Sequence, residues 1–554
     1  MKTRIVRALL LAAATCLAGL TLLLSAGHAA PAPLVTRGPY LQAAQPRAVS
    51  VAWYTDAVTE GLLQWRQEGG SWHDARDPAG PALRHEVSLP ELEPGLAYEY
   101  RLFDGAGRLL VSGTSDWFGF QAPSGGLKMA AFGDCGTGGA DQYAVARSLA
   151  RRFGGADSAL VLGDVVYPNG AETDYDARFF APYASLLARM AFFAALGNHD
   201  FETEAGRPYL GVFTLPRNGP AGLVPETAYS FERGGVHFVV HDSNLPAAKL
   251  LEQAGPWHVA DLRASSARFR VAALHHSPWS SGENSLTPEV VALREALTPF
   301  FARTGVDLVL AGHDHTYERT RPLEGVVYVT SGAGGYALYP RRAVREETAV
   351  FYNARHGLSA LTLSGQVLQL EQTDVEDCRV DTLQLYKPAA EGDAWRLLPG
   401  TSAPPEGWTR VEFADQAWRL APAGFGFGGA DLATSLAELR GATPTLHARL
   451  AFDVPSAGVV DDALLRLRYD DGFVAWLNGN EVARRNVPAG AGPRTPASAR
   501  HPGDDYETFA LPPALLRSGR NVLAIEAHNV AADDATLVLL PELTLVAADP
   551  GRCP

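Results

Sequence analysis

The sequence lacks several features that mark whole classes of protein. Its 55 glycines follow no fixed period, which excludes a collagen-like chain. Hydrophobic residues make up 47% and charged residues 19% of the 554 residues, so the chain is not mainly disordered. Basic residues are outnumbered, and the net charge of −14 argues against a protein whose main task is to bind nucleic acid. No internal repeat is present, so this length predicts three or four domains.

Long hydrophobic runs are also missing, except for one near the N-terminus. Lys2, Arg4 and Arg7 precede an apolar run at 8–24, and small residues follow up to Ala30. This order is typical of a secretory signal peptide at 1–30, whose removal would leave a net charge of −17. We expect export to an extracellular or periplasmic location and no stable membrane span afterwards. The alternative is a retained anchor on the cell surface, although the run is short for a membrane span.

Cysteine is scarce, and only Cys135, Cys378 and Cys553 remain after the predicted signal peptide. An odd number leaves at least one thiol unpaired within the chain. Cys378 and Cys553 bracket the last part of the sequence, so a disulfide between them would tie the ends of that domain in an oxidising compartment. Two free thiols are the alternative, and the sequence leaves the choice open. We predict that Cys135 is a small buried side chain.

The first two segments after the signal peptide differ in their hydrophobic pattern. Residues 33–124 alternate apolar and polar side chains, which predicts an all-β domain. Residues 127–373 alternate apolar strands with helical stretches at 143–153 and 177–189. That pattern predicts a layered α/β domain.

The third segment, 390–549, returns to short strands. Its clearest hairpin joins the runs 473–477 and 481–483 through Asn478-Gly479, a pair that favours a tight β-turn. We predict an all-β domain here, with residues 374–390 as the linker that precedes it.

Five apolar strands of the middle segment run directly into side chains that bind metals. The motifs that follow these strands are Gly133-Asp134, Gly163-Asp164-Val165-Val166-Tyr167, Gly197-Asn198-His199, His275-His276 and Gly312-His313-Asp314-His315. Strands that share a direction present their carboxyl ends at one edge of a sheet, so these side chains can converge. Oxygen and imidazole donors suit hard or borderline metals. Seven ligands are too many for one tetrahedral ion and suit two ions that share a carboxylate.

In this order the motifs resemble those of calcineurin-like metallophosphoesterases, and specifically the purple acid phosphatases. Tyr167 is the more specific sign, because many relatives lack that tyrosine ligand. Arg37–Gln42 and Leu92–Arg101 resemble the fibronectin-III-like domain that precedes the catalytic domain in this family. The resemblance covers residues 35–373. It implies a fibronectin-III-like β-sandwich followed by a four-layer α/β metallophosphoesterase sandwich.

The resemblance also implies a centre of two metal ions, bridged by Asp164. The expected ligands of the first ion, Fe(III), are Asp134, Asp164, Tyr167 and His315. The expected ligands of the second ion, which is Fe(II), Zn or Mn, are Asp164, Asn198, His275 and His313.

Two histidines keep alternative roles at this stage. His276 competes with His275 as the metal ligand, and we favour His275 because it directly ends the apolar strand. His199 follows a predicted ligand, so we expect it to stabilise the transition state or to protonate the leaving group. Its alternative is a structural histidine bonded to a carboxylate. Asp200 is expected to orient its neighbours rather than to react.

The last segment resembles a galactose-binding-like jelly roll, through Tyr469–Gly479 and Asn521–Glu526. Some such modules bind sugars, so carbohydrate binding by this domain is an open expectation. Its tryptophans are predicted to lie in the core rather than to form sugar platforms. Asp470-Asp471 is only a weak indication of a calcium site.

Together these observations predict a secreted binuclear acid phosphatase that hydrolyses monoesters of small phosphorylated substrates. The resemblance implies attack by a metal-bound hydroxide. A phosphodiesterase that uses the same metals is the alternative. An alternative interpretation from a different functional class is a surface glycan-binding protein with a vestigial phosphatase domain.

Overall fold

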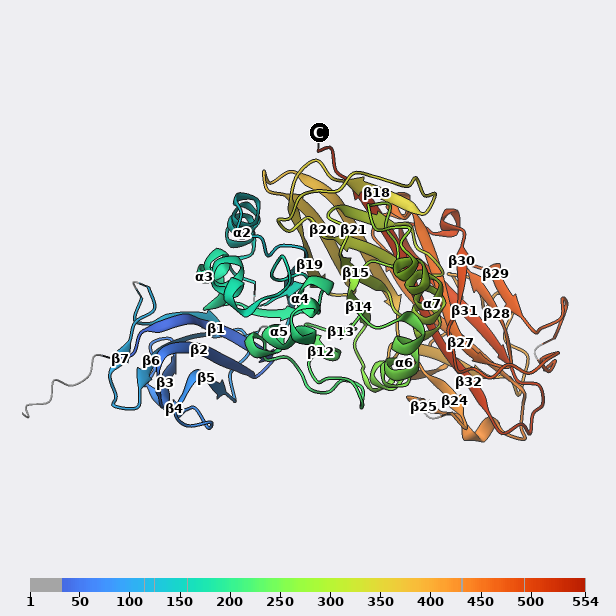
Figure 1. Ribbon diagram of the computed structural model, residues 1–554. Helices are drawn as coiled ribbons and strands as arrows, with labels where there is room; N and C mark the ends of the chain where they lie inside the picture. The colour runs from blue at the N-terminus through green and yellow to red at the C-terminus, as the bar shows by residue number, and fades with distance from the viewer. Residues whose placement is uncertain are drawn as a thin grey trace, which may run out of the picture.

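The computed structural model describes residues 32–553, except 114, 124, 157, 430, 431 and 493. The predicted signal peptide at 1–30 lies outside the described residues. Figure 1 shows an elongated molecule, with a β-domain at the N-terminal end, an α/β centre and a second β-region at the other end. Among the described residues, every helix falls short of the length and hydrophobicity that a membrane span requires.

Two antiparallel sheets form the N-terminal domain. One sheet contains β1 (Val35–Gln45), β2 (Ala48–Thr59) and β5 (Ala82–Leu89). The other contains β3 (Gly61–Gln67), β4 (His73–Arg76), β6 (Ala97–Asp104), β7 (Leu109–Leu110) and β8 (Phe118–Gln121). Alternate residues of β2 and β6, such as Val51, Trp53, Tyr100 and Leu102, are buried together in one core. The predicted β-sandwich is therefore confirmed.

Two further sheets face each other in the central domain. One sheet has the order β12-β13-β14-β15-β17-β16-β18. These strands are β12 (Tyr229–Arg233), β13 (Val236–Val240), β14 (Phe269–His276), β15 (Leu308–Gly312), β16 (Tyr317–Thr320), β17 (Val327–Ser331) and β18 (Thr348–Tyr352). The opposite sheet begins with β11-β10-β9-β19-β20. Its strands here are β9 (Leu127–Phe132), β10 (Ser158–Val161), β11 (Ala191–Ala194), β19 (Gly357–Ser364) and β20 (Val367–Asp374).

Helices cover the outer faces of both central sheets, as Figure 1 shows. These are α2 (Ala140–Phe153) and α3 (Ala181–Leu187) on one side, and α6 (Ala247–Ala264) and α7 (Pro288–Thr304) on the other. On β14, Val271 and Ala273 face the core between the sheets, whereas Ala272 and Leu274 pack in the cluster with α6 and α7. The predicted four-layer α/β sandwich is confirmed. The short helices α4 (Asn198–Glu202) and α5 (Arg207–Val212) follow β11.

The C-terminal region contains two layers of strands. One layer is the sheet β23-β22-β26-β31-β28-β29. Its strands are β22 (Ala394–Pro399), β23 (Arg419–Pro422), β26 (Thr445–Val454), β28 (Gly472–Leu477), β29 (Asn480–Arg485) and β31 (Gly519–His528). The other layer comprises β24 (Phe425–Phe427), β25 (Thr434–Ser435), β27 (Asp462–Asp470), β30 (Glu507–Leu511) and β32 (Leu537–Pro550). The all-β prediction is confirmed, and Trp395, Trp408 and Trp418 are buried as predicted.

The predicted linker at 374–390 is wrong, because most of it is strand β21 (Arg379–Ala389). This strand pairs with β20 on one side and with β32 on the other, so a single eleven-stranded sheet continues from the central domain into the C-terminal layer. The segment contains the polar residues Asp381 and Lys387. Both are buried and paired: Asp381 binds Arg319, and Lys387 binds Asp307.

A fully buried ion network joins the C-terminal layer to the central domain. Lys387 Nζ lies 2.8 Å from Asp307 and 3.2 Å from Glu542 Oε2. Arg270 binds the other oxygen of Glu542 at 2.7 Å, and Arg466 binds Asp307 at 2.8 Å. Burial alone would raise the pKa of Glu542, but Arg270, Lys387 and Arg466 hold it well below its usual range.

A disulfide between Cys378 and Cys553 also joins the ends of the C-terminal segment. It connects the start of β21 to the chain just after β32, which resolves the choice that the sequence left open. Cys135 is free and buried, as predicted.

The Glu542→Gln substitution tests how strongly the buried network holds these two parts together. Because it leaves the buried cations Arg270, Lys387 and Arg466 with Asp307 as the one buried carboxylate of the network, we expect the free energy of unfolding to fall by about 3–5 kcal/mol. Guanidinium denaturation measures this change. The matched control is Glu438→Gln, which breaks the exposed pair with Arg419 and should cost less than about 1 kcal/mol. Equal effects of the two substitutions would contradict the network's role.

Candidate metal centre

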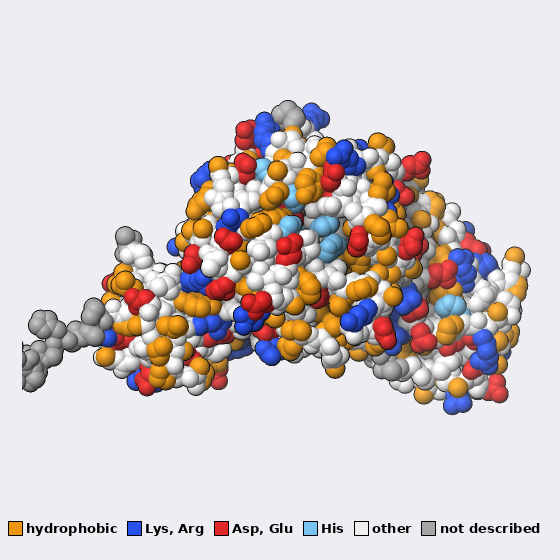
Figure 2. Space-filling model, in the orientation of Figure 1, with side chains coloured by type: hydrophobic (Ala, Val, Ile, Leu, Met, Phe, Trp, Pro, Cys, Tyr) orange, Lys and Arg blue, Asp and Glu red, His pale blue; other side chains and the backbone are white. Residues whose placement is uncertain are grey.

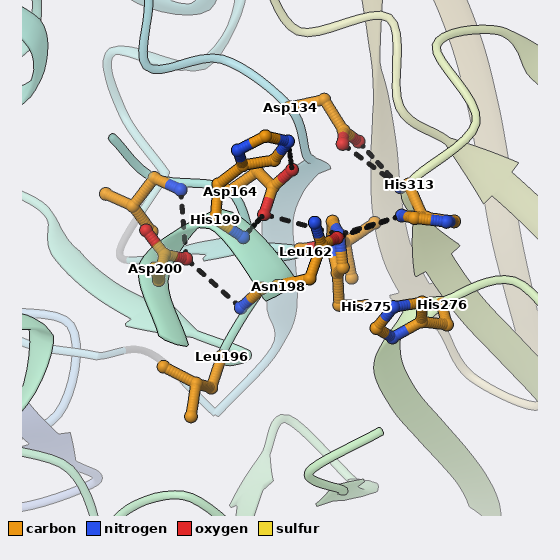
Figure 3. Close-up of polar contacts among 12 residues, drawn as sticks. Asp134, Leu162, Asp164, Leu196, Asn198, His199, Asp200, His275, His276 and His313 are labelled. Carbon is orange, nitrogen blue, oxygen red and sulfur yellow. Dashed lines mark hydrogen bonds and ion pairs between the residues drawn. The ribbon is translucent and has the colours of Figure 1, made fainter. Parts of the chain in front are cut away.

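The five predicted strand ends meet where the two central sheets face each other (Figure 3). The strands β9, β10 and β11 are parallel neighbours in one sheet, and β14 and β15 are parallel neighbours in the other. Their carboxyl ends therefore bring together Asp134, Asp164 and Asn198 from one sheet with His275 and His313 from the other.

The backbone turns sharply at these strand ends. Asp134, Asp164 and His313 all have a positive φ, between 51° and 70°. Two neighbouring positions have no room for a side chain: a Cβ at Gly197 would lie 2.2 Å from Asp164 Oδ1, and one at Gly312 would lie 2.6 Å from Asp134 Oδ2. Glycine is thus required at both positions for the backbone to approach the carboxylates.

Asp134, Tyr167 and His315 form one group of potential ligands. The hydroxyl of Tyr167 lies 3.3 Å from Asp134 Oδ1 and 3.2 Å from His315 Nε2. His315 Nε2 lies 3.5 Å from the same carboxylate oxygen. All three side chains are buried.

Asn198, His275 and His313 form a second group. The side-chain oxygen of Asn198 lies 2.9 Å from His275 Nε2 and 3.1 Å from His313 Nδ1, and these two nitrogens are 3.3 Å apart. Asp164 connects the two groups: one ligand atom each from Asp134, Asp164 and His275 lies within 4.8 Å of the other two.

The chemistry of these donors fits metal ions. His275 Nδ1 lies 2.8 Å from the carbonyl oxygen of Leu162, and His315 Nδ1 lies 2.9 Å from that of Ala337. Each Nδ1–H therefore donates to a carbonyl, which leaves a lone pair on Nε2. The lone pair of His275 faces Asn198 Oδ1 and the carboxylate of Asp164, so acceptors converge without a donor between them. A bound cation relieves that repulsion.

The buried carboxylates add to this demand for positive charge. Burial raises the pKa of Asp164, and the neighbouring charge of Asp134 raises it further; His275 opposes both only when its ring is protonated. The donor set suits two ions of hard or borderline type.

The adjacent residues His275 and His276 lie in different surroundings. His275 belongs to the ligand group, whereas His276 Nδ1 lies 2.9 Å from Ser243 Oγ. The ring of His276 lies against that of His313, with centroids 4.3 Å apart. His276 is therefore a neighbour of the ligand group, and His275 is the better placed of the two to bind an ion.

Known proteins are similar to this region in sequence and in fold. Residues 127–317 match the family model of the calcineurin-like phosphoesterase. Purple acid phosphatase 21 of Arabidopsis thaliana is 27% identical over 270 residues, which cover 45% of this chain and 58% of that protein. Acid phosphatase type 7 of Homo sapiens is 26% identical over 416 residues, which cover 62% of this chain and 89% of that protein.

A solved structure agrees at the level of the fold. Purple acid phosphatase PPD1 from yellow lupin seeds superposes with a TM-score of 0.53 and 20% sequence identity, covering 62% of this chain and 72% of that chain. The chain contains a calcineurin-like phosphoesterase domain. Purple acid phosphatases are among its relatives, as is a nucleotide pyrophosphatase/phosphodiesterase of Hordeum vulgare that is 25% identical over 251 residues. This chain spans little more than half of the length of the Arabidopsis protein named above.

The seven predicted ligands form what we call the phosphoesterase centre: Asp134, Asp164, Tyr167, Asn198, His275, His313 and His315. His199 lies at the solvent side of this centre. Figure 2 shows histidine side chains at the surface of the central domain, and 34% of the His199 side chain is exposed. Its backbone N–H donates to Asp164 Oδ1 at 3.0 Å, and its Nδ1 contacts the carbonyl of Pro168. The Nε2 atom lies 3.9 Å from Asp164 Oδ2, which is too long for a hydrogen bond, so this is the ring nitrogen that a substrate can reach.

Asp200 organises the backbone of the phosphoesterase centre, as Figure 3 shows. Its buried carboxylate accepts N–H groups of Val165 and Gly197 at 3.1 Å and of Val166 at 3.2 Å. It thus joins the loop that carries Asp164 and Tyr167 to the start of α4, which carries Asn198. This is the orienting role that the sequence predicted.

Two aromatic residues of this region were not predicted. The ring of Tyr336 lies 4.3 Å from that of Tyr167, and Tyr339 stacks on His315 with centroids 3.9 Å apart. The glycine-rich run at 331–335 comes directly before Tyr336 and is the sequence signal nearest to both tyrosines.

The Asp200→Asn substitution tests whether backbone positioning controls the phosphoesterase centre. The asparagine side chain has one acceptor oxygen where the aspartate has two, and its NH2 group would face a backbone N–H group that the carboxylate accepts. We therefore expect the affinity for metal ions to fall by about 10–100-fold. Titration of metal-stripped protein measures the affinity. Glu204→Gln is the control, because it changes an exposed pair with Arg207 in the next turn of the chain. Unchanged affinity in Asp200→Asn would refute the role.

Proposed function

We propose that the protein is a secreted acid phosphatase that hydrolyses phosphate monoesters of small substrates at a centre of two metal ions. The observation that carries the proposal is the meeting of two ligand groups at Asp164, one with Tyr167 and the other with Asn198. Relatives that are named acid phosphatases and purple acid phosphatases support the choice of reaction. Secretion rests on the signal-like sequence at 1–30.

Each ligand group would hold one ion, and Asp164 would be shared between them. We assign Fe(III) to the group of Asp134, Tyr167 and His315, because carboxylate and ionised phenol oxygens are hard donors. The group of Asn198, His275 and His313 would hold Fe(II), Zn or Mn. When bound, such a pair of ions binds the substrate phosphate, acidifies water and offsets the negative charge of the transition state.

The protein's own residues would hold this centre rigid and orient the substrate. His199 and His313 donate their backbone N–H groups to Asp164 and Asp134, which fixes both carboxylates. With Nδ1–H of His199 donating to the carbonyl of Pro168, its Nε2 carries a proton only in the imidazolium form, and in that form it can donate to a phosphate oxygen or to the leaving alcohol. His276 stays beside the ligands through Ser243.

Hydrolysis of a monoester and a diester of the same chromogenic alcohol tests this function. We expect faster cleavage of the monoester, and Asp164→Asn should abolish it because both ions lose their shared ligand. Faster cleavage of the diester would favour the phosphodiesterase alternative. Cleavage that Asp164→Asn leaves unchanged would refute the site.

The Tyr167→Phe substitution tests the assignment of Fe(III). Charge transfer from the phenol oxygen to ferric iron should give the wild-type protein a visible absorption band, and the phenylalanine variant should lose it. Absorption spectroscopy with iron analysis measures both. An active wild-type protein that contains no iron and has no colour would overturn the assignment.

A further inference from the structure

An exposed aromatic ring lies beside the phosphoesterase centre and takes no part in the predicted ligand set. Tyr336 follows β17 and is 37% exposed, although its ring centroid lies 4.3 Å from that of the buried Tyr167. The rings of Tyr336 and His315 are also neighbours, with centroids 5.0 Å apart. Tyr336 therefore forms part of the solvent-facing rim beside two predicted ligands of the first ion.

Hydrogen bonds hold the loop that carries Tyr336 against those ligands. The backbone N–H of Tyr336 donates to the carbonyl of Asp134 at 3.0 Å, and that of Tyr339 donates to the carbonyl of His315 at 3.1 Å. His356 Nε2 lies 2.9 Å from the carbonyl oxygen of Tyr336, which adds a third hydrogen bond to the same loop. The ring of Tyr336 is thus positioned by the residues that also carry the ligands.

The backbone just before Tyr336 is closely packed as well. At Gly335, φ is 150°, and a Cβ would lie 2.9 Å from the Cα of Gln142 and 3.0 Å from the carbonyl oxygen of Cys135. Because a side chain has no room there, the loop packs directly on the segment that follows Asp134.

Tyr336 lies on the side of the centre where His199 reaches solvent. The ring of Tyr167 has its centroid 4.6 Å from that of His199 and 4.3 Å from that of Tyr336, so both are neighbours of one buried tyrosine. Both neighbours are partly exposed, whereas Tyr167 is not. A leaving group that meets His199 therefore lies close to the exposed ring of Tyr336.

We propose that Tyr336 determines specificity by stacking on a leaving group that carries an aromatic ring near the ester oxygen. This inference rests on the proposed function and names phosphate monoesters of aromatic and arylalkyl alcohols as the preferred substrates. Aromatic rings attract one another with centroids about 4.5–7 Å apart, which is worth roughly 2–10-fold in affinity. Because the loop already holds the ring in place, little of this gain is lost to ordering.

Two monoesters with the same carbon skeleton, benzyl phosphate and cyclohexylmethyl phosphate, test this role. Metal-loaded wild-type protein is compared with Tyr336→Leu, which removes the ring, and with Tyr336→Phe, which keeps it. We expect the ratio of kcat/KM for the benzyl ester to that for the cyclohexylmethyl ester to fall by about 2–10-fold in Tyr336→Leu. Tyr336→Phe should keep the wild-type ratio.

The control is Trp117→Ala, which removes an exposed aromatic ring of the N-terminal domain. Trp117 lies beside residues 154–156, at the opposite end of β10 from Asp164, so its loss should leave the ratio unchanged. An unchanged ratio in Tyr336→Leu, with both esters still cleaved, would overturn the inference and leave the proposed function standing. Failure of the wild type to cleave either ester would instead refute the proposed function.

Binding of analogues that cannot be cleaved gives a second readout that does not depend on turnover. Benzylphosphonate and cyclohexylmethylphosphonate are titrated into the metal-loaded proteins by calorimetry. We expect Tyr336→Leu to bind benzylphosphonate about 2–10-fold more weakly and to bind the cyclohexyl analogue as the wild type does. An equal loss of affinity for both would show that Tyr336 only supports Tyr167, and would overturn the inference.

Discussion

Two buried carboxylates, Asp134 and Asp164, set the requirement that the central domain must meet. Both are almost inaccessible to solvent and lie near each other where the two sheets face. Buried charges are costly unless they are paired or bind metals. Backbone N–H groups of His199 and His313 and the hydroxyl of Tyr167 meet part of this demand, and lone pairs on the neighbouring imidazole and amide groups favour cations as further partners. The fold therefore makes a place for metal ions before any substrate arrives.

The C-terminal region supports this site from the opposite ends of the same strands. Arg270 lies at the beginning of β14, which ends at the histidine pair, and Asp307 immediately precedes β15, which leads to His313. Both belong to the buried ion network with Lys387, Arg466 and Glu542. The network holds the start of each strand, while the ligands occupy the end. We infer that the C-terminal region stabilises the scaffold of the centre as well as forming a domain of its own.

The sequence predicted the parts of this structure that depend on local patterns. Apolar strands followed by glycine and a polar residue identified Asp134, Asp164, Asn198 and His313, because strand direction brings such ends together. It failed where polar side chains are buried by partners distant in the chain, as at Asp381 and Lys387, whose strand β21 was predicted to be a linker.

Removal of the metal ions tests the central claim most directly. The protein is treated with a chelator, assayed for phosphate release from a chromogenic monoester, and assayed again after metal ions are returned. The account predicts that release stops when the ions are removed and resumes when they are restored, while the circular dichroism spectrum shows that the fold persists. Undiminished phosphate release by the folded, metal-free protein would contradict it.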